Sequence, residues 1–173
     1  MLNRILYSVL YRFRKVNTKL IKGSDNSIKN KGKMVGCCIE IFGDNNSIEI
    51  GENSIIRNVN FNITGNNCRI IIGENNSIKS GELVAQDNKT LIHIGNKTTI
   101  ENAHIAVTED ASKIEIGEDC MLANHIEIRS GDSHSILNSE GERINFAQNI
   151  KIHDHVWIGN RSMVLKGVEI DSG

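Results

Sequence analysis

A glycine that follows two isoleucines recurs at one fixed interval in this 173-residue chain, and that interval limits the folds open to it. Each glycine lies 22 residues after the last, with isoleucine one and three positions before it; the glycines are Gly51, Gly73, Gly95 and Gly117. A period of this size is typical of a solenoid, in which each repeat forms one coil stacked on the next. The alternation of apolar and polar residues before each glycine predicts strands. The expected fold is therefore all-β, a parallel β-helix of short coils.

A polar turn accompanies the strands and predicts the corners of the coils. It reads Gly43-Asp44-Asn45-Asn46 and returns as Gly65-Asn66-Asn67. Asparagine tolerates the left-handed backbone conformation that a tight corner needs, so we interpret these asparagines as corner formers and exposed ladders, not as substrate ligands. Isoleucine dominates the apolar residues, aromatic residues make up only 4% and proline is absent, which suits a narrow, stacked aliphatic core in one domain.

Charge is unevenly distributed along the chain. Residues 1–22 hold six basic and no acidic residues, which leaves 14 basic and 21 acidic residues, a net charge of −7, in the remainder. An acidic solenoid gives no indication of nucleic-acid binding. The cysteines, which we interpret as core fillers in a reducing compartment, lack the spacing of a zinc site; they are Cys37, Cys38, Cys68 and Cys120. With no signal peptide or membrane-spanning run, we expect a cytoplasmic protein.

The first segment, residues 1–22, has the pattern of an amphipathic helix over residues 2–21. Its apolar residues recur at three- and four-residue spacing, with basic residues beside them, and Gly23 ends the pattern. Such a helix suits a cap over the end of the solenoid core. It also suits the anionic surface at the inner face of a membrane, or a partner surface.

The remaining domain, residues 23–173, contains an interruption and then a shorter repeat. The 22-residue period breaks after Arg129, and a polar, aperiodic excursion loop at about 130–149 takes its place. Loops of this kind on a rigid solenoid often carry function. A six-residue repeat then follows, marked by Ile152, Ile158, Val164 and Ile170. The chain stops early in a further hexapeptide, so we expect its C-terminal end to be incomplete.

The loop and the repeat after it together resemble the hexapeptide-repeat acyltransferases, above all those that O-acetylate bacterial capsular and lipopolysaccharide sugars. The residues that carry this resemblance run from Ser130 to Ile136 and from His153 to Gly159, the second stretch reading His-Asp-His-Val-Trp-Ile-Gly. The resemblance implies a left-handed β-helix, a homotrimer with active sites between neighbouring solenoids, and acetyl-CoA as co-substrate. It also implies that His134 acts as general base in a direct transfer to a sugar or lipid-linked saccharide, and that Trp157 lines the cleft.

The chemistry of the loop residues agrees with this resemblance. A neutral imidazole is a suitable base near pH 7 and needs a partner that fixes its tautomer; Asp132, two residues before His134, is our candidate. The catalytic candidates are thus His134 and Asp132. For the cofactor we select Trp157, Gly159 and Lys166, and for the substrate Ser133, Asn145 and His155.

Three alternatives remain open at this stage. Histidines at 125, 134, 153 and 155 allow a zinc site of the carbonic anhydrase kind, although their spacing does not resemble that family and we predict no metal. A sugar N-acyltransferase of the same fold would use the same base on an amine. The third alternative is a non-catalytic or truncated β-helix.

Overall fold

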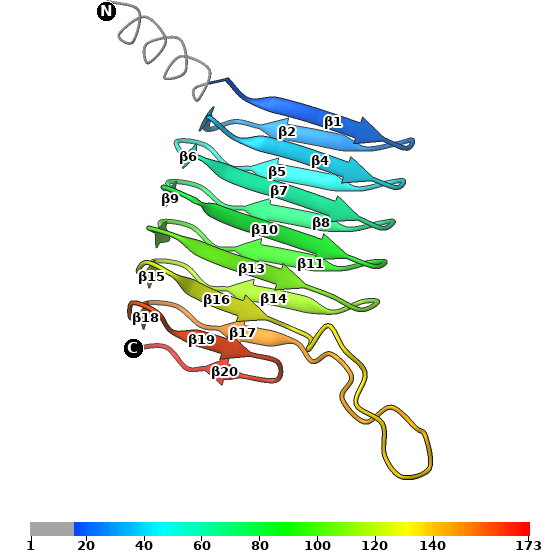
Figure 1. Ribbon diagram of the computed structural model, residues 1–173. Helices are drawn as coiled ribbons and strands as arrows, with labels where there is room; N and C mark the ends of the chain where they lie inside the picture. Colours follow the sequence, from blue (N-terminus) through cyan, green and yellow to red (C-terminus); the bar gives the residue numbers. More distant parts are fainter. Residues whose placement is uncertain (1–15) are drawn as a thin grey trace, which may run out of the picture.

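The computed structural model describes residues 16–173, which form a three-sided β-solenoid of parallel strands (Figure 1). Sheet A contains β1 (Thr18–Lys22), β4 (Cys38–Phe42), β7 (Val59–Thr64), β10 (Gly81–Gln86), β13 (Ala103–Val107), β16 (Ile126–Arg129) and β19 (Met163–Leu165). Sheet B contains β2 (Ser27–Asn30), β5 (Ser47–Ile50), β8 (Arg69–Ile72), β11 (Leu91–Ile94), β14 (Lys113–Ile116), β17 (Ile150–Ile152) and β20 (Glu169–Ile170). Sheet C contains β3 (Lys33–Val35), β6 (Ile55–Arg57), β9 (Ser77–Ile78), β12 (Thr99–Ile100), β15 (Met121–Leu122) and β18 (Trp157–Ile158).

The core consists of isoleucine rows that run along the solenoid axis. In sheet B, Ile48, Ile70, Ile92 and Ile114 pair in strict register on successive strands and are fully buried. The predicted 22-residue period is the length of one such coil. Because neighbouring coils present the same side chain at the same position, the branched aliphatic residues stack without gaps. The hexapeptide positions also lie where expected, one each in β17, β18, β19 and β20.

The corners confirm the interpretation of the asparagines. Asn45 and Asn67 have positive φ angles of 56° and 59°, and the Asn45 side-chain amide donates to Asn67 Oδ1 on the next coil at 2.6 Å. Buried Asn46 donates to the Gly65 carbonyl at 2.9 Å and accepts the N–H of Cys68 at 2.8 Å. These side chains satisfy corner backbone groups that the sheets leave unpaired.

Close backbone approach explains the repeated corner glycine. Gly43 has a φ of +126°, and a Cβ placed there would lie 2.0 Å from the carbonyl oxygen of Gly65 on the next coil. A side chain at this position would both strain the backbone and prevent the coils from stacking.

The prediction of a helix over residues 2–21 is wrong for its C-terminal part, because Thr18–Lys22 forms strand β1. The solenoid therefore begins before the expected boundary at residue 22. Parallel pairing of β1 with β4, in which Ile21 lies opposite Ile41, overrides the helical spacing of the apolar residues. The turn Gly23-Ser24-Asp25-Asn26 has the same pattern as the corner Gly43-Asp44-Asn45-Asn46 and is the sequence signal for a coil that begins before residue 23. The rest of the expected helix, residues 1–15, lies outside the described residues.

A single excursion interrupts the described coils between β16 and β17. Residues 130–149 project from the corner between sheets A and B (Figure 1). Ile114 pairs with Ile150, a separation of 36 residues where the preceding pair, Ile92 and Ile114, is separated by 22, so the excursion adds 14 residues. Among residues 16–173 the structure contains no helix with the length and hydrophobicity to cross a membrane.

Candidate functional site

The excursion loop, residues 130–149, is closed at its base and folded back on itself. The N–H of Gln148 donates to the carbonyl of Ser130 at 2.9 Å, which joins the two ends of the loop. Fully buried Ser130 binds the preceding coil, where its Oγ accepts the N–H of Thr108 at 2.9 Å. Further out, the N–H of Ile144 donates to the carbonyl of Ile136 at 2.9 Å. The loop is thus a short hairpin fixed to the rim of the solenoid.

Asn145 organises the foot of this hairpin. Its side chain is 7% exposed, and its amide nitrogen donates to Asp132 Oδ2 at 2.9 Å and to the carbonyl of His134 at 2.7 Å. Its amide oxygen accepts the N–H of Ile136 at 2.7 Å. One buried amide therefore holds the chain before His134, at Asp132, and after it, at Ile136. From the sequence we expected Asn145 to bind the substrate. In the structure its side chain instead bonds other residues of the loop.

Lys166 and Asp132 form an ion pair at the same foot. The Lys166 ammonium, in the turn after β19, contacts the Asp132 carboxylate and lies 3.3 Å from the carbonyl oxygen of Asn145. The hydrogen bond from Lys166, with that from Asn145, holds the pKa of Asp132 below its ordinary value. Asp132 is the predicted partner of His134, yet within the described residues no hydrogen bond joins its carboxylate to the His134 ring.

A second tether, Glu109 with Arg143, was not predicted from the sequence. The Arg143 guanidinium pairs with Glu109 and donates to the carbonyl of Asn145 at 3.2 Å, while the other Glu109 oxygen accepts the N–H of Ala147 at 3.1 Å. Glu109 belongs to the coil that precedes the loop, 34 residues before Arg143. Nothing in the local sequence marks either residue, because their contact depends on where the loop returns to the solenoid.

The His134 pocket is a hollow of about 260 Å³ between the loop and the corner of the solenoid. Its lining comprises Gln86, Asp87, Thr108, Glu109, Ser133, His134, Ser135 and Arg143. The His134 ring is exposed and makes no hydrogen bond to another described side chain, so both ring nitrogens are available to a bound molecule. Ser133, with a φ of 63°, turns the chain just before it. An exposed neutral imidazole in such a pocket can accept a proton from a hydroxyl group.

The other predicted site residues lie away from His134. Trp157 is 70% exposed on β18, in sheet C, which is the side of the prism opposite the corner that carries the loop (Figure 1). Gly159 follows in the turn to β19, where its carbonyl accepts the Ser162 hydroxyl at 2.8 Å. His155, at the corner between sheets B and C, contacts Asp119 through Nδ1 at 2.9 Å. One chain alone does not bring these three residues to His134.

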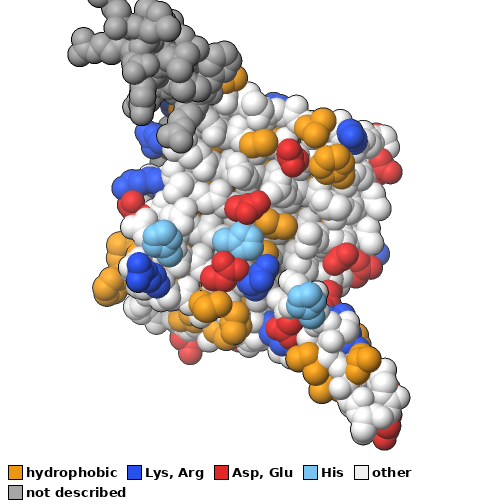
Figure 2. All heavy atoms as spheres, viewed as in Figure 1, with side chains coloured by type: hydrophobic (Ala, Val, Ile, Leu, Met, Phe, Trp, Pro, Cys, Tyr) orange, Lys and Arg blue, Asp and Glu red, His pale blue; other side chains and the backbone are white. Residues whose placement is uncertain are grey.

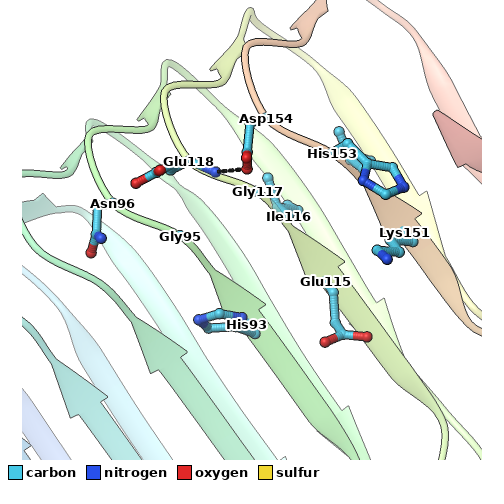
Figure 3. Close-up of a pocket in the computed structure, with 11 residues that line it drawn as sticks. His93, Gly95, Asn96, Glu115, Ile116, Gly117, Glu118, Lys151, His153 and Asp154 are labelled. Carbon is cyan, nitrogen blue, oxygen red and sulfur yellow. Dashed lines mark hydrogen bonds between the residues drawn. The ribbon is translucent and has the colours of Figure 1, made fainter. Parts of the chain in front are cut away.

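A second hollow, of about 320 Å³, lies on sheet B and its corner with sheet C (Figure 3). His93, Glu115 and Lys151 point outward from three successive strands, and Asp154 accepts the N–H of Glu118 at 2.8 Å. The His153 ring beside them donates through Nε2 to the Glu169 carboxylate at 2.7 Å, which lowers the pKa of Glu169. None of the selected site residues lines this hollow. Across residues 16–173, no three His, Cys, Asp or Glu side chains converge as a metal-binding group would require.

Solved structures similar to this one include those of two acetyltransferases. The polysialic acid O-acetyltransferase OatWY matches with a TM-score of 0.83 and 34% identity, over 91% of this chain and 74% of that one. The polySia-specific acetyltransferase NeuO matches with a TM-score of 0.82 and 31% identity, over 91% and 73%. No protein-family model matches the chain.

Two relatives found by sequence are also polysialic acid O-acetyltransferases. A polysialic acid O-acetyltransferase of Neisseria meningitidis is 49% identical over 51 residues, which is 29% of this chain and 24% of the relative. One of Escherichia coli O1:K1 / APEC is 38% identical over 50 residues, 28% of this chain and 16% of the relative. The matched sequence thus spans a quarter or less of either relative, whereas the structural likeness extends over most of both chains.

Proposed function

Because the chain belongs to the left-handed β-helix acetyltransferases that include the polysialic acid O-acetyltransferases, we propose that it O-acetylates a capsular polysaccharide. The observation that carries this proposal is the likeness to OatWY and NeuO along nearly the whole solenoid, combined with a histidine whose ring is free in a pocket beside the excursion loop. Acetyl-CoA supplies the acetyl group as an activated thioester. The protein's own part is to place the acceptor hydroxyl and remove its proton.

His134 performs the proton transfer in this proposal. Its neutral imidazole accepts the hydroxyl proton as the acceptor oxygen attacks the acetyl carbon, and then protonates the departing sulfur, so that no acyl-enzyme forms. Asn145 and the Asp132–Lys166 pair fix the backbone on both sides of His134 and act as positioning residues. Donors for the developing oxyanion would be backbone N–H groups or the Trp157 indole N–H.

A neighbouring chain completes the site in this proposal. His134 projects from the corner between sheets A and B, and Trp157 from the opposite sheet, so the two meet only if the loop of one subunit approaches sheet C of another. Four large apolar side chains of the loop are exposed and suit such a contact; they are Ile136, Leu137, Ile144 and Phe146. A cyclic homotrimer would repeat this arrangement three times. Trp157, beside exposed Met121, would then offer an apolar wall to the cofactor, with Gly159 and His155 close by.

Direct assay of acetyl transfer tests the function. Wild-type protein is incubated with radiolabelled acetyl-CoA and a panel of de-O-acetylated capsular polysaccharides. We expect alkali-labile label in the polymer; alkali-stable label would instead indicate N-acetylation. His134→Ala should lower the rate by roughly 10²–10⁴ while leaving the fold intact, because it removes the general base. His93→Ala, on sheet B, is the matched control. An active His134→Ala protein would refute the mechanism.

Complementation tests the shared site. His134→Ala and Trp157→Ala should each be inactive alone. When the two are co-expressed, mixed trimers contain interfaces with an intact His134 facing an intact Trp157, and activity should return to a fraction of the wild-type value. Two inactive variants that stay inactive together in verified mixed trimers would place both residues in one subunit's site, contrary to the proposal.

A further inference from the structure

A groove on the outer face of sheet A leads into the His134 pocket. Its upper part is a hollow of about 290 Å³ on strands β4, β7 and β10, and its lining comprises Glu40, Phe42, Asn62, Ile63, Thr64, Glu82, Val84 and Gln86. Gln86 also lines the His134 pocket, so the two hollows meet at this side chain. Figure 2 shows this face of the solenoid, on which acidic, histidine, basic and hydrophobic side chains are interspersed.

The register of the strands sets the direction of the groove. Phe42, Thr64 and Gln86 occupy equivalent positions on three successive strands of sheet A. Neighbouring strands lie about 4.8 Å apart, so this row extends about 10 Å along the solenoid axis before the His134 pocket begins. The combined groove therefore has room for several sugar residues in a row, whereas the His134 pocket alone holds the reacting one.

The lining chemistry suits a sugar chain. Asn62, Thr64 and Gln86 offer amide and hydroxyl groups, which both donate and accept hydrogen bonds. Val84 and Phe42 offer apolar surface for the C–H faces of sugar rings; Phe42 is 36% exposed, with the Lys22 ammonium 5.5 Å from its ring centroid. A largely preformed surface with a few convergent polar groups is typical of ligand sites.

Carboxylates outnumber cations along the groove, where Lys22 stands beside Phe42 at the end farther from His134. Glu40, Glu82, Asp87 and Glu109 line the two hollows, and the lone Lys or Arg in either lining is Arg143, already paired with Glu109. Glu82 accepts a hydrogen bond from Asn62 and lies 3.8 Å from His104 Nε2. In the described part of the chain, neither Glu40 nor Asp87 has an ion-pair partner. A polyanion would meet repulsion here, whereas hydroxyl groups would find strong acceptors.

We propose that the acceptor is a glycan chain without acidic groups, bound along this groove over several residues, with its terminal reacting residue at His134. This inference rests on the proposed acetyltransferase function and narrows its substrate class. It separates this chain from the relatives whose names specify polysialic acid, a polymer with a carboxylate on every sugar. Carboxylates of the groove accept hydrogen bonds from the sugar hydroxyls and at the same time exclude acidic polymers.

Glycan binding measured without acetyl-CoA tests the inference separately from catalysis. The full chain is applied to an array of neutral oligosaccharides of one to eight residues and to α2,8-linked polysialic acid. We expect binding to neutral chains of three or more residues and none to polysialic acid. Gln86→Trp, at an exposed position where the hollows meet, should weaken binding at least about tenfold by obstruction, and Glu40→Gln should weaken it severalfold by removing a charged acceptor.

The control is Glu49→Gln, an acidic position on the outer face of sheet B, which should bind as the wild type does. Preference for acidic glycans, absence of glycan binding, or binding unchanged by Gln86→Trp overturns the inference. Glycan binding that depends on the groove, but without acetyl transfer in the separate radiolabel assay, would instead refute the proposed function and leave the groove assignment standing.

Discussion

Asn145 offers the sharpest test of how the excursion loop positions His134. Its side chain makes three hydrogen bonds of 2.7–2.9 Å inside the loop, to Asp132, to the carbonyl of His134 and to the N–H of Ile136. Each is worth about 1 kcal/mol net, so Asn145→Ala should destabilise the closed loop by about 3 kcal/mol. That free energy corresponds to a change of roughly a hundredfold in the ratio of closed to open loop.

The solenoid should remain folded in this variant, because the hydrogen bonds of the Asn145 side chain all lie within residues 130–149 and its loss leaves the bonds between coils intact. The assay is hydrogen exchange of peptides from the loop and from the core strands of the same protein, together with kcat and KM. We expect faster exchange confined to the loop, a large fall in kcat and unchanged protection of the core. Asn145→Asp should be worse than Ala near neutral pH, because it places a second carboxylate against Asp132.

A matched control is available in the same hairpin. Asn138 also bonds backbone groups, accepting the N–H groups of Glu140 and Glu142 at 3.0 and 2.9 Å, but it lies at the tip, away from His134. Asn138→Ala should loosen the tip and leave the rate nearly unchanged. If Asn145→Ala raised only KM and left loop exchange as in the wild type, Asn145 would be a substrate ligand and our reasoning about the loop would be refuted.

Three further predictions concern the ion pair, the core and the corners. Lys166 lowers the pKa of Asp132 in the folded protein, so the ion pair stabilises the loop above the ordinary aspartate pKa of 3.8 and this stability is lost as the pH falls through the lower folded value. Lys166→Met should therefore raise the pH at which acid opens the loop, as measured by hydrogen exchange. Ile92→Ala should lower the free energy of unfolding in urea by roughly 2–5 kcal/mol, since the fully buried side chain leaves a cavity in the isoleucine row; a cost below that range would mean that neighbouring coils collapse to fill it. Gly43→Ala should prevent folding or severely lower the free energy of unfolding. Gly141→Ala, at a φ of +82° with no heavy atom near the added Cβ, should lower it by only about 1 kcal/mol. Equal losses in the two variants would contradict the close-approach argument.

Much of the fold could be predicted because each coil of a solenoid repeats the same short sequence pattern. The distance between Gly51 and Gly73 is the length of one coil, and the residues before each glycine alternate because their side chains point alternately into the core and outward. The error at Thr18–Lys22 has the same physical origin. A short apolar segment fits both a helical stripe and a strand, and the pairing with β4 that decides between them is not local.

The position of the site in the chain could be predicted, but the contacts between its side chains could not. The broken period located the loop around His134, since an interruption is visible without knowing the structure. The partners of the loop could not be predicted, because Asp132 contacts Lys166 and Arg143 contacts Glu109 at a separation of 34 residues in each case. Side-chain chemistry near His134 in sequence suggested Asp132 as its partner, whereas Asp132 has a stronger electrostatic attraction to the ammonium of Lys166.

The closed base of the excursion loop has an evolutionary consequence. Its ends are joined by the hydrogen bond between Gln148 and Ser130, and the coil resumes in register with Ile150 opposite Ile114, as though the 14 additional residues were absent. Changes in the length or composition of the hairpin therefore need not propagate into the coils. Lineages could therefore lengthen, shorten or replace the outer part of this hairpin in one recombination event and still inherit a folded solenoid.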